Sequence, residues 1–132
     1  MPGRADDWLR QAQRDLKHSP NALKDCDFEW SCFAAQQTAE KGRKAVYQAI
    51  NMDAQRAFYF GFTKRVGIVS PIQEVFYSYS KILSRYYIET RYANGFPEGA
   101  PFEYFDENMA REAIRAAEAI LEWCRNIISK SK

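Results

Sequence analysis

The sequence lacks the residues on which several enzyme classes depend. Its 132 residues include a single histidine, His18, and no CxxC, HExxH, P-loop or dinucleotide-binding glycine motif. A kinase, a dehydrogenase and a zinc enzyme therefore have no support. The acidic residues Asp6, Asp7, Asp25 and Asp27 lie near expected helix starts, where carboxylates act as caps. We therefore expect neither a metal site nor a cofactor, and we expect His18 to be solvated or to cap a helix.

Cysteine and long apolar runs are also scarce. The three cysteines are odd in number, and no pair has zinc-finger spacing. We interpret Cys32 and Cys124 as small core residues in a reducing compartment. No apolar run approaches the roughly 20 residues that a bilayer-spanning helix needs, and no signal-peptide pattern is present. These observations predict a cytoplasmic protein without membrane association.

Charge and composition point to one folded domain. The formal net charge is only +2, so global charge gives little support for nucleic-acid binding, although a local basic patch is compatible with it. Hydrophobic residues make up 46% of the chain and aromatic residues 15%, which is enough for a packed core. We predict a single domain over residues 1–132.

Apolar spacing of three and four predicts long helices and no strands. They are expected over residues 5–23, 27–50, 70–87 and 106–129, with Asp27, Ser70 and Asp106 as caps, and with a kink or restart at Ser19, before Pro20. Residues 51–69 have no clean period and predict an irregular connection. The predicted fold is all-α, an up-and-down bundle of four long helices with a possible short fifth helix.

The second helix should be central, because both of its sides are partly apolar. One side presents small residues that let another backbone approach, namely Cys32, Ala35, Ala39, Gly42 and Ala49. The opposite side carries Phe33, Gln36, Glu40, Arg43 and Tyr47. A carboxylate that is buried there requires a partner.

Several motifs occur together in the order found in a known family. Residues 27–50 read "DFEWSCFAAQQTAEKGRKAVYQAI", residues 7–16 read "DWLRQAQRDL", and residues 84–101 read "SRYYIETRYANGFPEGAP". The sequence resembles the short prokaryotic type of the HEPN family, the higher eukaryotes and prokaryotes nucleotide-binding domains. The resemblance implies a helical bundle that is usually dimeric. It also implies a role in cleaving RNA, in binding nucleotides, or in pairing with a small nucleotidyltransferase in a toxin-antitoxin-like system.

The sequence departs from the nuclease motif of this family. Active members carry an arginine, four to six residues, and then a histidine, but no histidine follows Arg85 or Arg91 at that spacing. Metal-free RNA cleavage therefore loses its obvious proton carrier. We expect a catalytically silent domain that binds a nucleotide or RNA phosphate. The alternative is a metal-free ribonuclease with a degenerate active site.

The residues expected to bind the ligand lie in two segments. They are Arg85 near the end of the third long helix, Arg91 and Tyr92 in the segment after it, and Gln36, Gln37 and Glu40 in the second helix. Arginine grips phosphate and tyrosine stacks on bases, although these residues could equally fasten the connector, residues 90–105, onto the bundle. We predict that the connector folds back on the second helix and that Arg85 or Arg91 pairs with Glu40.

The pattern also predicts association between copies. In the last helix Ile120, Trp123 and Ile127 extend the apolar stripe beyond what one intrachain contact requires. We expect that this face, or the small-residue face of the second helix, forms a two-fold interface.

Overall fold

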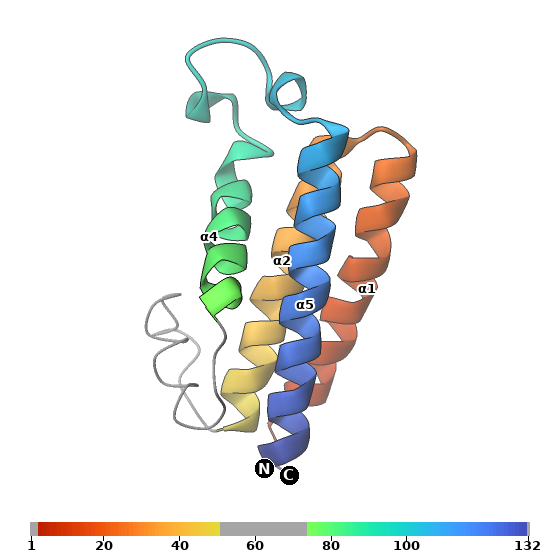
Figure 1. Ribbon diagram of the computed structural model, residues 1–132, viewed down its shortest axis with the longest axis vertical. Coiled ribbons are helices and arrows are strands. Elements are labelled where there is room, and N and C mark those ends of the chain that lie inside the picture. The colour runs from red at the N-terminus through yellow and green to blue at the C-terminus, as the bar shows by residue number, and fades with distance from the viewer. Residues whose placement is uncertain (1–2, 51–73, 132) are drawn as a thin grey trace.

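The chain forms four long helices that run up and down (Figure 1). The computed structural model describes residues 3–50 and 74–131. The long helices are α1 (Ala5–Lys24), α2 (Phe28–Ala49), α4 (Glu74–Glu89) and α5 (Glu107–Ser131). The predicted all-α fold is confirmed, and no strand occurs in this part of the chain. The irregular connection predicted over residues 51–69, and the cap predicted at Ser70, lie outside the described residues.

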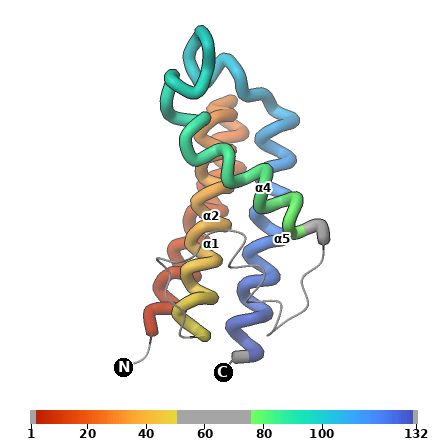
Figure 2. Tube along the Cα trace, turned by 90° about the vertical axis from the view of Figure 1, so that its left-hand side faces the viewer, coloured from red at the N-terminus to blue at the C-terminus, as the bar shows by residue number. Residues whose placement is uncertain are grey.

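The connector lies at one end of the bundle, opposite both termini (Figure 2). It contains two short 3-10 turns, η2 (Ala93–Gly95) and η3 (Pro101–Tyr104). The rings of Phe96 and Tyr104 stack with their centroids 4.0 Å apart, and the Tyr104 hydroxyl donates a hydrogen bond to the Glu98 carbonyl. Glycine and proline are typical turn residues, and these contacts hold the turns of this segment in place.

The small-residue face of α2 packs against α5 within the chain. A Cβ atom added at Gly42 would lie 3.3 Å from Cys124 Sγ and 3.5 Å from Leu121 Cδ1. Gly42 is therefore required for the close approach of the two helices, as the small residues predicted.

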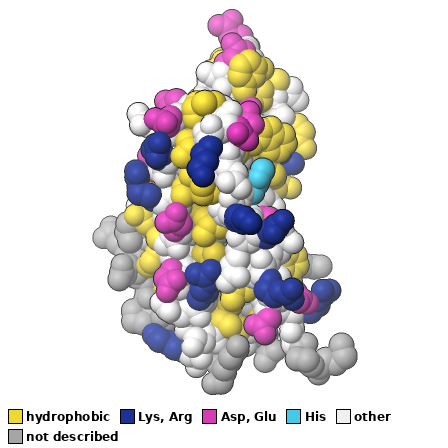
Figure 3. Space-filling model, turned by 90° about the vertical axis from the view of Figure 1, so that its right-hand side faces the viewer, with side chains coloured by type: hydrophobic (Ala, Val, Ile, Leu, Met, Phe, Trp, Pro, Cys, Tyr) yellow, Lys and Arg dark blue, Asp and Glu magenta, His cyan; other side chains and the backbone are white. Residues whose placement is uncertain are grey.

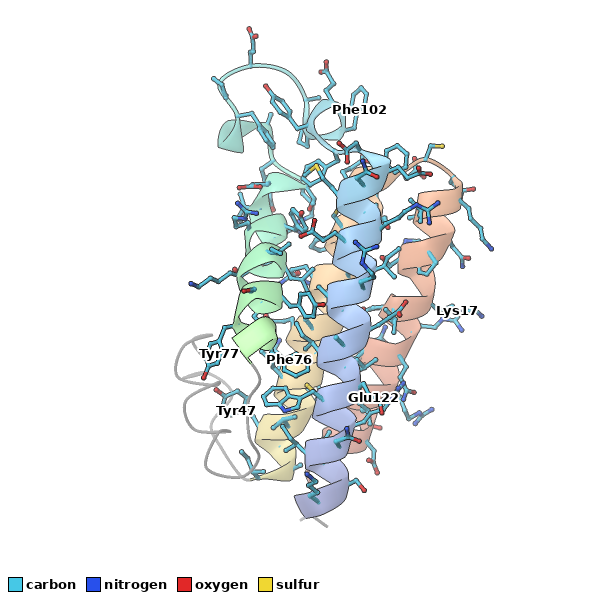
Figure 4. All side chains as sticks on the ribbon, in the orientation of Figure 1. Lys17, Tyr47, Phe76, Tyr77, Phe102 and Glu122 are labelled. Atoms are coloured by element: carbon cyan, nitrogen blue, oxygen red, sulfur yellow. The ribbon has the colours of Figure 1, made fainter. Side chains whose placement is uncertain are left out.

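The surfaces predicted to form a dimer interface are buried by packing within the chain. Ile120 and Ile127 are 2% and 0% exposed. Trp123 stacks on Phe76 of α4 with 5.5 Å between ring centroids, and Figure 4 labels Phe76 on the side of α4 that faces α5. The placement of a two-fold interface on either face was therefore wrong, because α5 is covered by α1, α2 and α4 of its own chain.

Helix α1 continues through Pro20, so the predicted restart at Ser19 is wrong. Ser19 and Ser31 are both fully buried between α1 and α2. The Ser19 hydroxyl donates to the Ser31 carbonyl at 2.7 Å, and the Ser31 hydroxyl donates to the Ser19 carbonyl at 2.8 Å. This reciprocal pair joins the two helices at the point where proline disfavours helix, and tertiary packing overrides the local preference.

The predicted caps have different outcomes. Asp27 precedes α2, but its side chain makes no capping hydrogen bond there. Asp106 does cap α5, because its Oδ1 accepts a hydrogen bond from the Met109 amide at 2.8 Å. The Asp106 prediction is therefore confirmed.

The turn between α1 and α2 has a left-handed residue that is not glycine. Cys26 has a φ of 62°. Its amide donates to the Leu23 carbonyl at 3.0 Å, and the Asp27 amide donates to the Ala22 carbonyl at 2.9 Å. This is the Schellman arrangement, which usually places glycine at the left-handed position.

Replacing Cys26 with glycine should stabilise the fold by about 0.5–1 kcal/mol. The left-handed conformation costs an ordinary residue about 1–2 kcal/mol, and glycine avoids this cost. Glycine also loses more backbone entropy on folding, which offsets part of the stabilisation. Urea denaturation of Cys26→Gly measures the difference. Cys26→Ala is the control, because alanine keeps the Cβ atom and should give no such gain. Equal stability of the two variants would contradict the prediction.

Candidate functional site

The site is centred on Arg91, which lies just beyond the end of α4. Its guanidinium carbon is 4.5 Å from the ring centroid of Phe33, 4.7 Å from that of Tyr87 and 5.0 Å from that of Tyr92. Its Nε donates to the Tyr87 carbonyl at 3.0 Å. Each ring contact contributes about 0.5–1 kcal/mol at an exposed site. The side chain is therefore held in one place by three rings and a backbone carbonyl.

Two of the three rings around Arg91 are about half exposed to solvent. Tyr87 and Tyr92 are 47% and 49% exposed. Trp30 at the start of α2 is 49% exposed and meets Phe33 edge-on, with 6.0 Å between centroids. We call these five residues, Trp30, Phe33, Tyr87, Arg91 and Tyr92, the Arg91 cluster. Large exposed apolar groups gathered around a cation are typical of a binding surface.

A hollow of about 220 Å³ between α1 and α2 adjoins this cluster. Figure 3 shows this face of the molecule, with the histidine beside hydrophobic side chains. Phe33 and Trp30 belong to both the hollow and the Arg91 cluster. The residues lining the hollow include Asp15, His18, Trp30, Phe33, Gln37 and Lys41.

The polar groups of the hollow are held by one another. Lys41 Nζ lies 2.6 Å from Asp15 Oδ2, and their side chains are only 21% and 18% exposed. Gln11 Nε2 donates to the other carboxylate oxygen of Asp15 at 3.0 Å. Gln37 Nε2 donates to Gln36 Oε1 at 2.7 Å. The hollow therefore has ordered polar walls and little net charge.

A second hollow, of about 360 Å³, lies near the start of α1. The residues that line it include Arg4, Asp7, Trp8 and Gln11. Arg4 Nε lies 3.0 Å from Asp7 Oδ2, and the two side chains are 77% and 51% exposed. Its charged groups are paired with each other on the surface, so this hollow offers less for a phosphate than the Arg91 cluster does.

The predicted partner of Glu40 is wrong. Glu40 Oε2 lies 2.7 Å from Arg43 Nη2, one turn further along α2. Arg91 instead packs on the Phe33 ring, and Arg85 lies exposed on α4. An arginine on the same helix face needs no loop closure to reach the carboxylate, and this explains why Arg43 is the partner. The first residues after α4 do contact the second helix, through Arg91 on Phe33, but the predicted pairing with Glu40 is not formed.

Replacing Glu40 with alanine should therefore cost about 1–2 kcal/mol, between the values for a surface pair and for a buried one. The Glu40 side chain is 38% exposed, so water screens its pair with Arg43, whereas the Arg43 side chain that loses its partner is only 13% exposed. A thermal melt of Glu40→Ala measures the cost, and Glu107→Ala, which breaks the exposed pair with Arg111, is the matched control. A loss of about 3 kcal/mol or more would show that Glu40 belongs to a buried network.

The structure brings some of the residues predicted for the site together and separates others. Arg91 and Tyr92 lie in the cluster, and Gln37 lines the adjoining hollow, whereas Gln36 is buried behind it. Arg85 and Glu40 are not among the residues of the cluster or those lining the hollow. The prediction missed Asp15, His18, Trp30, Phe33 and Lys41. Helical spacing could have identified these residues as neighbours. Positions 30, 33, 37 and 41 share one side of α2, and positions 15 and 18 share one side of α1.

The two buried thiols are not suited to act as nucleophiles. Burial raises the pKa of both Cys32 and Cys124 to about 12, which keeps these thiols protonated and unreactive near neutral pH. Across residues 3–50 and 74–131, no three histidine, cysteine or acidic side chains gather as a metal ion would require.

None of the helices in these residues has the length and apolar character needed to cross a membrane.

Comparison with known proteins gives a consistent result. The profile of the HEPN domain matches residues 5–127. TT1696 from Thermus thermophilus, known from a crystal structure, shares 32% sequence identity with this chain. The matched region covers 96% of this chain and 99% of TT1696, with a TM-score of 0.89. ST0689, an archaeal HEPN homologue, is 30% identical over 95% of this chain and 98% of its own, with a TM-score of 0.77.

A HEPN domain protein from Thermotoga maritima, tm0613, is also similar. It is 25% identical, covers 93% of this chain and 98% of its own, and has a TM-score of 0.71. Among curated proteins, none matches this sequence. The similar structures extend over nearly the full length of both chains in each pair.

Proposed function

The chain belongs to the HEPN domain family, and from this premise we propose that it binds a nucleotide or RNA at the Arg91 cluster without cleaving it. One observation carries the proposal. A single guanidinium is held within 5.0 Å of three ring centroids, and two of those rings are about half exposed. The terminal nitrogens of Arg91 have no hydrogen-bond acceptor among the described residues, so they can bind a ligand.

The chemistry of these groups matches the two parts of a nucleotide. The fork of an arginine meets two phosphate oxygens with two parallel hydrogen bonds. Aromatic rings stack on bases of any sequence, contributing about 1–3 kcal/mol per base. A cation fixed among half-exposed rings offers both interactions within one small surface.

The absence of a histidine after Arg85 and Arg91 supports a binding function rather than cleavage. General acid–base catalysis favours a group with a pKa near neutrality, and tyrosine, with a pKa near 10, is a poor base. One observation favours the alternative, a metal-free ribonuclease. His18, the only histidine, lines the hollow that shares Phe33 with the Arg91 cluster. Among the residues that line this hollow, His18 is of the type used most often in general acid–base catalysis.

One experiment separates the two functions. The full chain is titrated with AMP, ATP and a short single-stranded RNA by calorimetry at low salt, and the RNA is then analysed for cleavage on a gel. Our proposal predicts saturable heat with at least one of these ligands and intact RNA. Cleavage that disappears in both Arg91→Gln and His18→Ala would establish the ribonuclease instead. No heat with any ligand would overturn the binding function.

Two further parts of the proposal rest on the family alone. We propose that the chain forms a homodimer and acts with a small nucleotidyltransferase in a toxin-antitoxin-like system. Light scattering at micromolar concentration tests the first part, and a monomer would contradict it. Copurification with a small nucleotidyltransferase encoded beside this chain tests the second.

A further inference from the structure

The hollow between α1 and α2 is too small for a whole nucleotide. Its volume is about 220 Å³, whereas pockets for drug-sized ligands span roughly 300–1,000 Å³. One wall is aromatic, formed by Phe33 and the half-exposed Trp30. A single flat ring system fits this volume and this wall.

The charges of the hollow disfavour a phosphate there. The ammonium of Lys41 is neutralised by Asp15 at 2.6 Å, and Gln11 satisfies the second oxygen of that carboxylate at 3.0 Å. An anion would have to compete with Asp15 for Lys41. An uncharged polar ligand needs no such competition, because an ammonium has three donors and the described contacts of Lys41 use one of them.

The remaining polar groups match the edge of a base. Lys41 retains N–H donors for a carbonyl oxygen or ring nitrogen. The amide nitrogen of Gln37 is bonded to Gln36 at 2.7 Å, so the Gln37 carbonyl oxygen is left as an acceptor. A donor and an acceptor beside an aromatic wall are the features with which proteins orient a nucleobase.

We propose that this hollow is a base subsite, which receives the base of a nucleotide whose phosphate is held by Arg91. This inference rests on the proposed function of the Arg91 cluster. Phe33 connects the two parts, because its ring carries the Arg91 guanidinium at 4.5 Å and also lines the hollow. A free nucleotide and an unpaired residue of RNA present the same base and phosphate, so both are sources of this ligand.

The test compares ligands with and without a base. Calorimetry on the full chain measures UMP, AMP and ribose 5-phosphate, which share the sugar and phosphate. The base subsite predicts that a nucleotide binds at least about tenfold more tightly than ribose 5-phosphate. The trinucleotide UpUpU, measured against UMP, assigns the source to RNA if it binds more tightly and to free nucleotide if it does not.

Two variants place the base in the hollow. Gln37→Ala and Lys41→Met should each lower nucleotide affinity about threefold to tenfold and leave ribose 5-phosphate affinity unchanged. Lys44→Met is the matched control, because it removes the same charge from α2 at a position that lies over Trp8, 4.8 Å from the ring centroid. It should change neither affinity. If Lys41→Met fails to fold by circular dichroism, Gln37→Ala carries the test.

The outcomes separate the two claims. Equal affinity for UMP and ribose 5-phosphate, with both lost in Arg91→Gln, would overturn the base subsite while leaving the phosphate site intact. A base preference unaffected by both hollow variants would also overturn it. If neither ligand binds, the proposed function fails, and the subsite fails with it.

Discussion

Replacing Arg91 with glutamine is expected to weaken nucleotide and RNA binding by about ten- to a hundredfold. Hydrogen bonds to a charged group contribute about 1.5–3 kcal/mol, and Arg91 offers the fixed guanidinium at the centre of the cluster. Glutamine loses the charge and the fork while retaining a polar side chain. Calorimetry with the tightest nucleotide ligand measures the loss.

The variant must remain folded for this result to be informative. The rings of Tyr87 and Tyr92 are about half exposed, so removing the three cation–π interactions of Arg91 should cost about 1.5–3 kcal/mol of stability in total. Arg115→Gln on the exposed side of α5 removes the same charge away from the cluster and should leave affinity unchanged. Arg91→Lys keeps the charge without the fork and should show an intermediate affinity. Equal losses of affinity in the Arg91 and Arg115 variants would mean that binding follows net charge and not this site.

Replacing Gly42 with valine should destabilise the bundle by about 1–3 kcal/mol. Even a methyl group at this position would lie 3.3 Å from Cys124 Sγ and 3.5 Å from Leu121 Cδ1. Valine adds two further carbon atoms in a region where α2 and α5 are in direct contact, so the helices must separate or their side chains must leave preferred rotamers. Urea denaturation measures the loss.

A double variant tests whether Cys124 is the cause. Cys124→Ala alone should destabilise the protein by leaving a small cavity, since Cys124 is fully buried. In the double variant the valine should fill part of this cavity, so the combined loss should be smaller than the sum of the single losses. Strict additivity would show that the clash lies elsewhere.

The sequence predicts the fold well because each helix carries its own pattern. The small residues around Gly42 indicate a close helix contact, and this contact is formed with α5. Periodicity identifies a face but not the element that covers it. For this reason the face that contains Trp123 is one of two faces that the pattern predicts for a two-fold interface, whereas Trp123 stacks on Phe76 of the same chain.

The site is less predictable because it depends on how helices align. Arg91 and Tyr92 were recognised from their residue types in the connector. The hollow exists only because α1 and α2 are held in one register, by Ser19 and Ser31 at one level and by Asp15 and Lys41 at another. No single segment encodes that alignment. The wrong partner predicted for Glu40 has a simpler cause. Arg43 lies on the same face of α2, one turn away, and can pair with Glu40 without any other segment.

The most direct test of the central claim is an NMR titration of the full chain with AMP and UMP. It follows the Nε–H resonance of Arg91 and the indole N–H resonances of Trp30 and Trp8. A ligand at the Arg91 cluster should shift the Arg91 and Trp30 resonances together, with one dissociation constant that agrees with calorimetry. The Trp8 resonance should stay unchanged, because Trp8 lies at the second hollow near the start of α1. Saturable shifts at Trp8 without shifts at Arg91 and Trp30, or no shifts at all, would contradict a nucleotide site at the Arg91 cluster.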